Sequence, residues 1–527
     1  MIALICSWLF TSYSLTVSRK VGRLSTITNY DDVSYLSKAA DIYFTFRQDG
    51  VVPGVKLLFT KSLHSPFTDL DALLGYMVFG FNTDQVYYAQ IVVLLSYLFF
   101  VGWFTRRLNG VFRASILLAS LAVPFASLCV QVFRPDQMSG IIVAGLAVGI
   151  LTSENLFDRK WKGVLLGLGL GLALLIKSTT FALILLVLAG AWFLTAMRML
   201  LLRKSNIGAI AINGILALLT ATVTASWYWM QHGSELWAYF IDNSFGKNAD
   251  VWRTSGGIRE HLLFYFQGGT LQSSLGLFVA PILLLFVGGC LSDLFQSRKP
   301  KLKMIAGGLL WMLVCIFGVY FLQGIKNQYM GGILYMFLFF GALVYAEALL
   351  LKCQTGLFAI PILGCCSALL LPLFSWSLYR YPSTEIVNPV WSANSKTTTL
   401  GLLSNLSEQI KSKPTPVLFT QAGPVVPEYV IMMLKSKSKE IVYENAALTR
   451  KLSDVIASLP RYDYVVLQDP EIEGRPGFPM PSEIWERDLK SYLDRGSEWS
   501  LLATYPTVDK KNVYLYERSN LITNPGL

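Results

Sequence analysis

Long apolar runs separated by short polar loops occupy the first two thirds of the chain. About eleven of these runs are long enough, or nearly so, to cross a hydrocarbon core roughly 30 Å thick. They lie at about 1–17, 86–105, 114–133, 138–152, 161–177, 179–198, 207–227, 274–294, 304–323, 331–351 and 355–374. The pattern predicts a polytopic α-helical membrane protein with about eleven transmembrane helices.

The composition agrees with this prediction. Of the 527 residues, 54% are hydrophobic and only 15% are charged. The mean hydropathy of +0.50 is too high for a single soluble core. Residues 1–17 lack a basic leader and a small-residue cleavage site, so we expect them to form a retained span rather than a signal peptide.

Basic residues gather in the short loops between the apolar runs. The formal net charge is +11, whereas residues 375–527 contain 17 Lys+Arg and 17 Asp+Glu. The excess therefore lies in the membrane part, which is the positive-inside pattern and argues against a nucleic-acid partner. The loop residues are Arg106, Arg107, Arg113, Arg159, Lys160, Lys162, Arg198, Arg203, Lys204, Arg298, Lys299, Lys301 and Lys303.

The basic loops also predict the orientation of the chain. Placing them inside puts the N-terminus in the cytoplasm and exports three polar stretches, 18–85, 228–273 and 375–527. We therefore expect a membrane module over 1–374 and an extracytoplasmic domain over 375–527. The expected location is a bacterial inner or plasma membrane.

The apolar period changes within residues 375–527, where short buried runs alternate with helical stretches. The expected strands are at 417–419, 441–443, 464–467 and 512–516, and the expected helices are near 397–412, 427–436, 448–459 and 482–494. This pattern predicts a compact α/β domain. It contains no glycine-rich phosphate loop, so we expect no nucleotide site and interpret the domain as acceptor recognition or structural support.

Two amphipathic helices are expected in the first exported stretch. Apolar residues recur at helical spacing over 33–44 and again over 67–81. Ser65 and Pro66 suit the N-cap and the first position of the second helix. Both helices are expected to lie in the membrane interface.

Adjacent carboxylates, Asp31 and Asp32, stand just before the first of these helices. Adjacent like charges raise each other's pKa, which suits a general base that works near neutral pH. An aspartate in this place also suits a helix N-cap, where it accepts hydrogen bonds from free backbone N–H groups. One aspartate is enough for a cap, so both interpretations stay open.

Three cations break the positive-inside pattern. Arg134, Lys177 and Lys326 each stand at the extracytoplasmic end of an apolar run. A cation within a span costs about 2.5 to 3.5 kcal/mol and therefore calls for a partner. A phosphate headgroup would serve, and snorkelling into ordinary lipid headgroups is the alternative. Asp136 is also placed to pair with Arg134.

Four stretches together resemble a known superfamily. They are NYDDVSYLSKA at 29–39, HSPF at 64–67 running to Phe79-Gly80, GLGLGLALLIK at 167–177 and KNQY at 326–329. In order and placement they resemble motifs of the C-superfamily (GT-C) glycosyltransferases, in particular the protein O-mannosyltransferases and the lipid A aminoarabinose transferases. The resemblance covers roughly residues 1–350, with Asp-Asp in place of Asp-Glu and His-Ser-Pro in place of a Pro-Pro pair.

This resemblance implies a reaction and roles for single residues. In that family the donor is a sugar on a polyprenyl or dolichyl phosphate, and transfer inverts the anomeric centre. Carried over to this chain, Asp31 is the general base and Asp32 its partner. The expected substrate contacts are Lys177, Lys326 and, more loosely, Arg134 at the donor phosphate, with His64, Asp136 and Tyr329 as further binding residues.

The same resemblance sets the expected partners. They are a polyprenyl-phosphate-linked sugar donor, a lipid, glycan or protein acceptor, and the membrane itself. No cofactor is assigned. Some members of the superfamily use a divalent metal, but this chain has no His pair at ligand spacing, so no metal is assigned either.

Other functions compete with sugar transfer. A transporter or flippase for lipid-linked saccharides would have charged or broken helices near mid-membrane and internal repeats, and neither is clear in this sequence. A polymerase or ligase of lipid-linked saccharides is a nearer alternative, and only the placement of Asp31 and Asp32 separates it. A non-enzymatic exported receptor would leave these carboxylates without a purpose.

Overall fold

The chain folds into two compact units. The computed structural model describes residues 2–25, 27, 30–61, 65–246, 249, 256–266, 270–326, 328–353, 393–410, 415–420, 427–436, 441–446, 449, 451–469, 481–507 and 511–519. The helical unit comprises residues 1–17, 58–75 and 85–384, and the sheet unit comprises residues 18–57, 76–84 and 385–527.

Apolar helices make up the helical unit. Its α-helices are α1 (Ile2–Val21, to residue 17), α4 (Pro66–Phe79, to residue 75), α5 (Ile91–Phe104), α6 (Gly110–Leu121), α7 (Pro124–Gln131), α8 (Pro135–Thr152), α9 (Lys160–Ile176), α10 (Phe181–Leu201), α11 (Ile207–Ser244), α13 (Ile258–Leu263), α14 (Thr270–Leu275), α15 (Val279–Leu283), α16 (Gly289–Phe295), α17 (Pro300–Leu322) and α18 (Gly332–Cys353). Its other turns are η2 (Gln85–Gln90), η3 (Ser178–Thr180), η4 (Gly276–Phe278), the π-helix η5 (Leu284–Gly288) and η6 (Gln328–Gly331).

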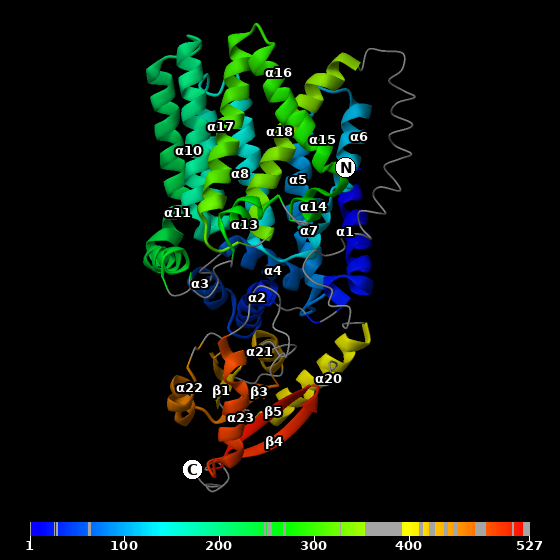
Figure 1. Ribbon diagram of the computed structural model, residues 1–527, viewed down its shortest axis with the longest axis vertical. Helices are drawn as coiled ribbons and strands as arrows, with labels where there is room; N and C mark the ends of the chain where they lie inside the picture. Colours follow the sequence, from blue (N-terminus) through cyan, green and yellow to red (C-terminus); the bar gives the residue numbers. More distant parts are fainter. Residues whose placement is uncertain are drawn as a thin grey trace. The chain divides into compact units, whose positions relative to one another are not determined.

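Seven of the described helical segments are long and apolar enough to cross a membrane, so the protein is an integral multi-pass membrane protein. They are Gln85–Phe104, Pro135–Thr152, Ser178–Leu201, Ile207–Ser244, Leu271–Phe295, Pro300–Leu322 and Tyr329–Lys352. The pair α6 and α7, bent by 64°, counts as an eighth if it forms one broken span. The run expected at 355–374 lies outside the described residues. Figure 1 shows α5, α8, α10, α17 and α18 packed side by side.

Small residues let α9 approach α11 closely. Gly163, Gly167 and Gly171 repeat every four residues along one side of α9. A Cβ atom added to Gly167 would collide with the backbone carbonyl oxygen of Ala217 on α11. In a membrane, where helices gain little from apolar burial, such small residues allow the backbone contact that holds two helices together.

Helix α11 differs from the sequence prediction. The apolar run was expected to end at 227 and an exported loop to begin at 228, but the helix continues to Ser244. Its 38 residues reach about 57 Å, nearly twice the thickness of the hydrocarbon core. The prediction failed because it ended the helix where the apolar run ends, whereas a helix needs only continuous backbone hydrogen bonding.

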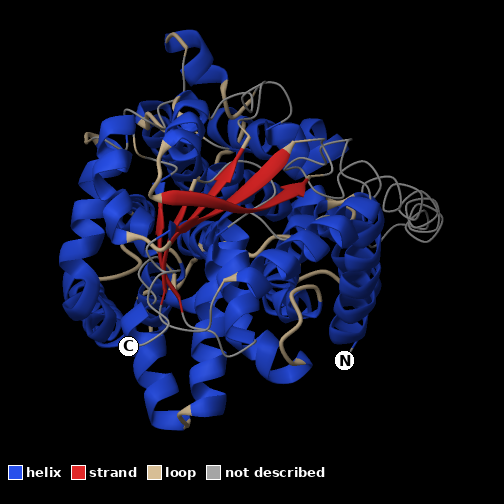
Figure 2. Ribbon diagram, turned by 90° about the horizontal axis from the view of Figure 1, so that it is seen from below, coloured by secondary structure: helices blue, strands red, loops and turns tan. Residues whose placement is uncertain are grey.

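A five-stranded sheet forms the centre of the sheet unit (Figure 2). The strand order is β2-β1-β3-β5-β4, with β1 parallel to β2 and β3, and with β5 antiparallel to β3 and β4. The strands are β1 (Thr415–Phe419), β2 (Ile441–Asn445), β3 (Tyr464–Gln468), β4 (Trp499–Pro506) and β5 (Asn512–Arg518). The α/β prediction is confirmed, although the sequence prediction missed β4.

Helices surround this sheet. They are α20 (Ala393–Gln409), α21 (Pro427–Ser436), α22 (Leu452–Ser458) and α23 (Glu486–Arg495), with the short turns η8 (Leu459–Arg461) and η9 (Pro481–Ile484). Alternate residues of β3 face opposite sides of the sheet, yet all five are buried. Both faces are therefore covered. The boundary predicted between 374 and 375 lies outside the described residues.

The sheet unit also contains residues 18–57 and 76–84, and the sequence did not predict that these residues belong with the C-terminal part. It includes η1 (Arg23–Ser25), α2 (Tyr30–Gln48) and most of α3 (Val51–Lys61). The apolar stripe of α2 was expected to face lipid, but Leu36 and Ala39 are fully buried and α2 packs on α21. An amphipathic stripe fits a protein surface as well as a membrane, and here protein covers it.

Candidate functional site

Both predicted carboxylates lie in the first turn of α2. The Asp32 side chain is fully buried. Arg23, from η1, donates a hydrogen bond from Nε to Asp32 Oδ2 at 3.1 Å, and its Nη2 lies 2.7 Å from Oδ1. The side chain of Asp31 lies outside the described residues. Asp32 is therefore held in a buried, two-point ion pair.

Arg23 was missed at the sequence level, although a signal was present. It lies in the stretch predicted to be exported, so it breaks the positive-inside pattern just as Arg134 does. A buried guanidinium needs an ionised partner with matching geometry, and a carboxylate supplies it. Of the two adjacent aspartates, Asp32 thus has Arg23 as its ion-pair partner.

The C-terminal part of the sheet unit holds this region in place. Lys396 of α20 donates hydrogen bonds to the Leu24 carbonyl oxygen at 3.0 Å and to both Asp84 carboxylate oxygens at 2.7 Å. Leu24 follows Arg23 directly. Lys435 of α21 forms an ion pair with Asp41 of α2. These contacts tie residues of the stretch 18–85 to the C-terminal part of the sheet unit.

Four of the predicted binding residues form two contacts at the start of α8. Asp136, in the first turn of α8, forms an ion pair with Lys177, which caps the C-terminus of α9. The Arg134 guanidinium lies 4.0 Å from the ring centroid of Tyr329, a cation–π contact. Arg134 and Asp136 are both buried.

Lys326 is buried beside this group. Its ammonium group donates hydrogen bonds to the carbonyl oxygens of Tyr320 at 2.6 Å and Phe321 at 3.1 Å. It also lies 5.7 Å from the ring centroid of Tyr265. Removal from water disfavours the charged form and lowers the pKa of Lys326 to about 8.

Tyr320 connects Lys326 to Met330, the residue after Tyr329. Its hydroxyl donates a hydrogen bond to the carbonyl oxygen of Met330 at 2.6 Å, and its own carbonyl oxygen accepts the hydrogen bond from Lys326. The start of α8 also packs closely on the start of α18, since a Cβ on Gly332 would lie 2.9 Å from the Asp136 carbonyl oxygen. We call Arg134, Asp136, Lys177, Lys326 and Tyr329 the cation cluster.

Helix α4 carries a buried acid that the sequence prediction missed. Gln90 Nε2 donates a 2.9 Å hydrogen bond to Asp71 Oδ2. Burial raises the pKa of Asp71 to about 7. Asp69, two residues earlier on α4, is fully buried as well. The available signal was the pair of carboxylates on either side of Leu70 in an otherwise apolar helix.

Ser65 occupies the N-cap place that the sequence predicted. Its Oγ accepts a hydrogen bond from the Thr68 backbone N–H at 3.3 Å. The same hydroxyl also contacts the carbonyl oxygen of Ile176, the residue before Lys177. The start of α4 is therefore tied to the end of α9. His64 itself lies outside the described residues.

The two groups of predicted site residues belong to different units. Asp31 and Asp32 are in the sheet unit, and the whole cation cluster is in the helical unit. Within the described part of the chain, no group of three or more His, Cys, Asp or Glu side chains is placed to hold a metal ion. The three predicted phosphate contacts, Lys177, Lys326 and Arg134, therefore all belong to the helical unit.

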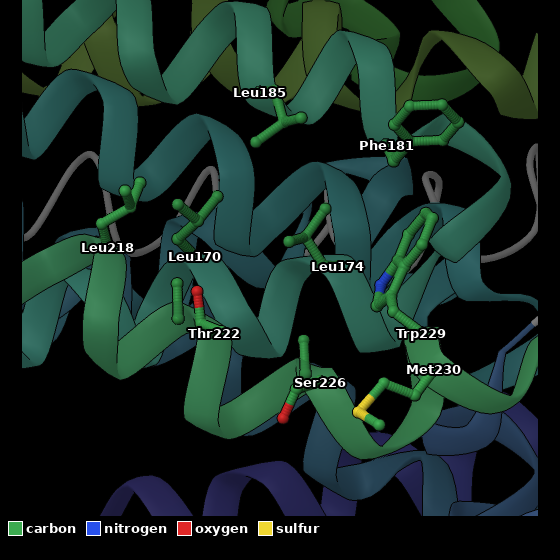
Figure 3. Close-up of a pocket in the computed structure, with 11 residues that line it drawn as sticks. Leu170, Leu174, Phe181, Leu185, Leu218, Thr222, Ser226, Trp229 and Met230 are labelled. Atoms are coloured by element: carbon green, nitrogen blue, oxygen red, sulfur yellow. The ribbon is translucent and has the colours of Figure 1, made fainter. Parts of the chain in front are cut away.

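A groove of about 460 Å³ opens between α9, α10 and α11 (Figure 3). Its walls are almost entirely apolar, and Thr222 and Ser226 contribute hydroxyl groups. Phe181 and Trp229 lie at one end, where their ring centroids are 5.3 Å apart, and Leu218 lies at the other end. The groove belongs wholly to the helical unit.

Two crystal structures of ArnT from Cupriavidus metallidurans are similar to this chain. The apo structure aligns with a TM-score of 0.59 at 14% identity, covering 96% of this chain and 97% of that chain. The structure bound to undecaprenyl phosphate aligns with a TM-score of 0.58 at 13% identity, with the same coverage. The chain therefore has the ArnT fold over nearly its whole length.

An oligosaccharyltransferase from Archaeoglobus fulgidus, in complex with Zn and sulfate, aligns less well. Its TM-score is 0.43 at 11% identity, covering 88% of this chain and 67% of that chain. No protein-family model matches the chain, and no curated protein matches it in sequence. The GT-C-like polytopic fold that the sequence motifs predicted is confirmed by the two ArnT structures.

Proposed function

We propose that this protein is a membrane glycosyltransferase. It moves a sugar from a polyprenyl or dolichyl phosphate carrier to an acceptor hydroxyl on the extracytoplasmic face, with inversion at the anomeric centre. The observation that carries the proposal is the ArnT fold over 96% of the chain, found also in an ArnT structure bound to undecaprenyl phosphate. The cation cluster adds support from this chain's own residues.

Asp31 is the proposed general base. The reaction needs one carboxylate to accept the proton of the attacking hydroxyl. Asp32 is fully buried and engaged with Arg23 at both carboxylate oxygens, so it holds the start of α2 in place. Asp32 therefore has a structural role, and Asp31 is the carboxylate that we assign to catalysis.

The cation cluster is the proposed donor phosphate site. It contains three cations and one carboxylate, so its members carry a net charge of about +2 when all are ionised. Fixed positive charge in a site with little water stabilises the phosphate that departs from the sugar. Lys177, Lys326 and Arg134 supply this charge. Asp136 and Tyr329 position two of these cations.

The remaining assignments follow the sequence interpretation. We assign the N-terminus to the cytoplasm, residues 375–527 to the extracytoplasmic side of a bacterial plasma membrane, and His64 to substrate binding. The acceptor is a lipid, a glycan or a protein. No metal is assigned to the reaction.

Purified protein incubated with a panel of polyprenyl-phosphate sugars tests the proposal. Asp31→Asn keeps the size of the side chain and removes the base, so transfer should fall by about a hundredfold or more. Asp49→Asn is the matched control, because Asp49 is exposed in the same stretch and should keep full activity. Full activity of a well-folded Asp31→Asn protein would refute the assignment.

Lys177 is tested separately. Lys177→Met removes a charge from the donor site but also leaves Asp136 buried without its ion-pair partner. The double variant Lys177→Met/Asp136→Asn avoids this second effect. If Lys177 binds donor phosphate, the double variant should still show a kcat/KM for donor reduced by about tenfold or more. An unchanged kcat and KM would contradict the role.

A further inference from the structure

Lys396, in the first turn of α20, contacts both ends of the stretch 18–85. Its ammonium group donates a hydrogen bond to the Leu24 carbonyl oxygen at 3.0 Å, near the start of this stretch. It also donates to both Asp84 carboxylate oxygens at 2.7 Å, at the other end. All three residues belong to the sheet unit. One side chain of the C-terminal part therefore joins two segments that are far apart in the sequence.

The Leu24 end of this contact leads directly to the proposed base. Leu24 follows Arg23, and Arg23 holds Asp32 through contacts of 2.7 Å and 3.1 Å. Asp32 follows Asp31 in the first turn of α2. Arg23, Leu24 and Asp32 are all buried, and closely packed side chains shift together rather than one by one. The hydrogen bond from Lys396 thus holds the same turn that holds the start of α2.

The hydrogen bonds within η1 itself are local. The Leu24 backbone N–H donates to Ser18 Oγ at 3.2 Å, and Ser25 Oγ donates to the Gly22 carbonyl oxygen at 2.7 Å. Such bonds shape the turn, but they do not set its position against distant elements. Lys396 supplies a contact that does, because α20 packs on α21 and α21 packs on α2.

The contacts of Lys396 match the chemistry of its side chain. An ammonium group has three donors, and here the three acceptors are one carbonyl oxygen and two carboxylate oxygens. Hydrogen bonds between charged groups are stronger than those between neutral groups. Arg19 lies 3.9 Å from the same Asp84 carboxylate. Removal of Lys396 therefore leaves Asp84 with a cation beside it and should not unfold the protein.

We propose that Lys396 is a positioning residue for the proposed base, Asp31. It acts through Leu24, Arg23 and Asp32, which hold the start of α2. The assignment rests on the proposed function and adds a residue of the C-terminal part to it. The proposed phosphate contacts belong to the other unit, so loss of Lys396 should lower kcat and leave the use of donor unchanged.

Lys396→Met tests this role in the purified full-length protein. It keeps the length of the side chain and removes its three hydrogen bonds. With a polyprenyl-phosphate sugar as donor, kcat should fall about tenfold, and the KM for donor should change by less than about twofold. Lys396→Arg can still donate to both partners and should recover most of the lost kcat. A kcat equal to wild type in Lys396→Met, or equal losses in the two variants, would overturn the proposal.

Lys435→Met is the matched control. Lys435, on α21, forms an ion pair with Asp41, which lies about 15 Å further along α2 than Asp31. This variant removes the same kind of ion pair from the same unit, but not at the start of the helix. Its kcat should stay within about twofold of wild type. Equal losses in Lys435→Met and Lys396→Met would show a general effect on the sheet unit and would overturn the proposal.

A double-mutant cycle with Asp31 separates positioning from general support of the fold. In an Asp31→Asn protein no base is left to position, so adding Lys396→Met should lower the residual transfer by less than about twofold. A residue that only supports the fold would lower transfer about tenfold in both backgrounds. That additive result would contradict the positioning role.

Asp84→Asn covers the case in which Lys396→Met does not fold. It weakens one contact of Lys396 and keeps the other, so kcat should fall about threefold with an unchanged KM for donor. An unchanged kcat would overturn the proposal. A wild-type protein that transfers no sugar from any polyprenyl-phosphate donor refutes the proposed function, and the role of Lys396 falls with it. Transfer that depends on Asp31 but not on Lys396 or Asp84 refutes the positioning role alone.

Discussion

Arg23 and Asp32 form a buried ion pair with two contacts, 2.7 Å and 3.1 Å long, between η1 and the first turn of α2. They are nine positions apart in the chain. The pair ties down the start of the helix that also carries Asp31. The position of the proposed base therefore depends on this ion pair.

Arg23→Met should destabilise the sheet unit. It leaves the Asp32 carboxylate buried without its partner, which costs about 3 to 5 kcal/mol when a buried pair is broken. Thermal unfolding in detergent measures the effect. Arg47→Met, at an exposed position later on α2, is the control and should unfold at the wild-type temperature. The double variant Arg23→Met/Asp32→Leu should recover much of the loss, and a single variant as stable as wild type would contradict this account.

Asp71 should make stability depend on pH. Burial raises its pKa from 3.8 to about 7, so between these values the folded protein binds a proton that the unfolded chain has released. The contribution of Asp71 to the free energy of unfolding should therefore be greatest below about pH 4. It should fall by roughly 4 kcal/mol as the pH rises to 7. Thermal unfolding across this range should show a smaller loss for Asp71→Asn, which keeps a neutral partner for Gln90. If the wild-type protein and the Asp71→Asn variant lost stability equally with rising pH, Asp71 would not be a buried neutral acid.

Lys326 should make donor binding weaken at alkaline pH. Its pKa of about 8 means that the ammonium group loses its proton as pH rises from about 7 to 9. Lys326→Arg stays charged throughout this range, because the guanidinium pKa exceeds 12. Affinity for a polyprenyl phosphate, measured at several pH values, should fall less steeply in the arginine variant. If the affinity fell equally steeply with pH in the wild-type protein and in the Lys326→Arg variant, Lys326 would not contact the donor phosphate.

Gly167→Ala should disrupt the packing of α9 on α11. The added methyl group would collide with the Ala217 carbonyl oxygen, and a rigid backbone atom cannot move aside cheaply. Gly149→Ala is the matched control on α8, where the same methyl group meets nothing within 4 Å. Alanine favours a helix over glycine by about 1 kcal/mol, so the control should be neutral or stabilised. Equal thermal stability of both variants would contradict the tight α9–α11 contact.

Much of the architecture was predictable because its signals are local. A long run of apolar residues indicates a membrane helix. Ser65 before Pro66 indicates the start of a helix. The strands β1, β3 and β5 were expected within two residues of their observed ends. Strand β4 was missed because most of its residues are partly exposed, so it has no continuous apolar run.

It was harder to predict which segment of the chain covers a given apolar surface. The stripe on α2 fits either lipid or protein, and the sequence does not say which surface will cover it. The structure shows that α21 covers it, although α21 lies almost 400 residues later in the chain. The end of α11 was misjudged for a related reason, since polar residues outside the apolar run continue the same helix to Ser244.

The sequence by itself determined the membrane class of the protein, the α/β character of its C-terminal part and the set of charged residues that need partners. The tertiary structure alone decided the partners. Lys177 pairs with Asp136 from 41 positions away, and Asp32 pairs with Arg23. Hydrophobic periodicity is a property of neighbouring residues, whereas an ion pair depends on which distant segments the whole fold brings into contact.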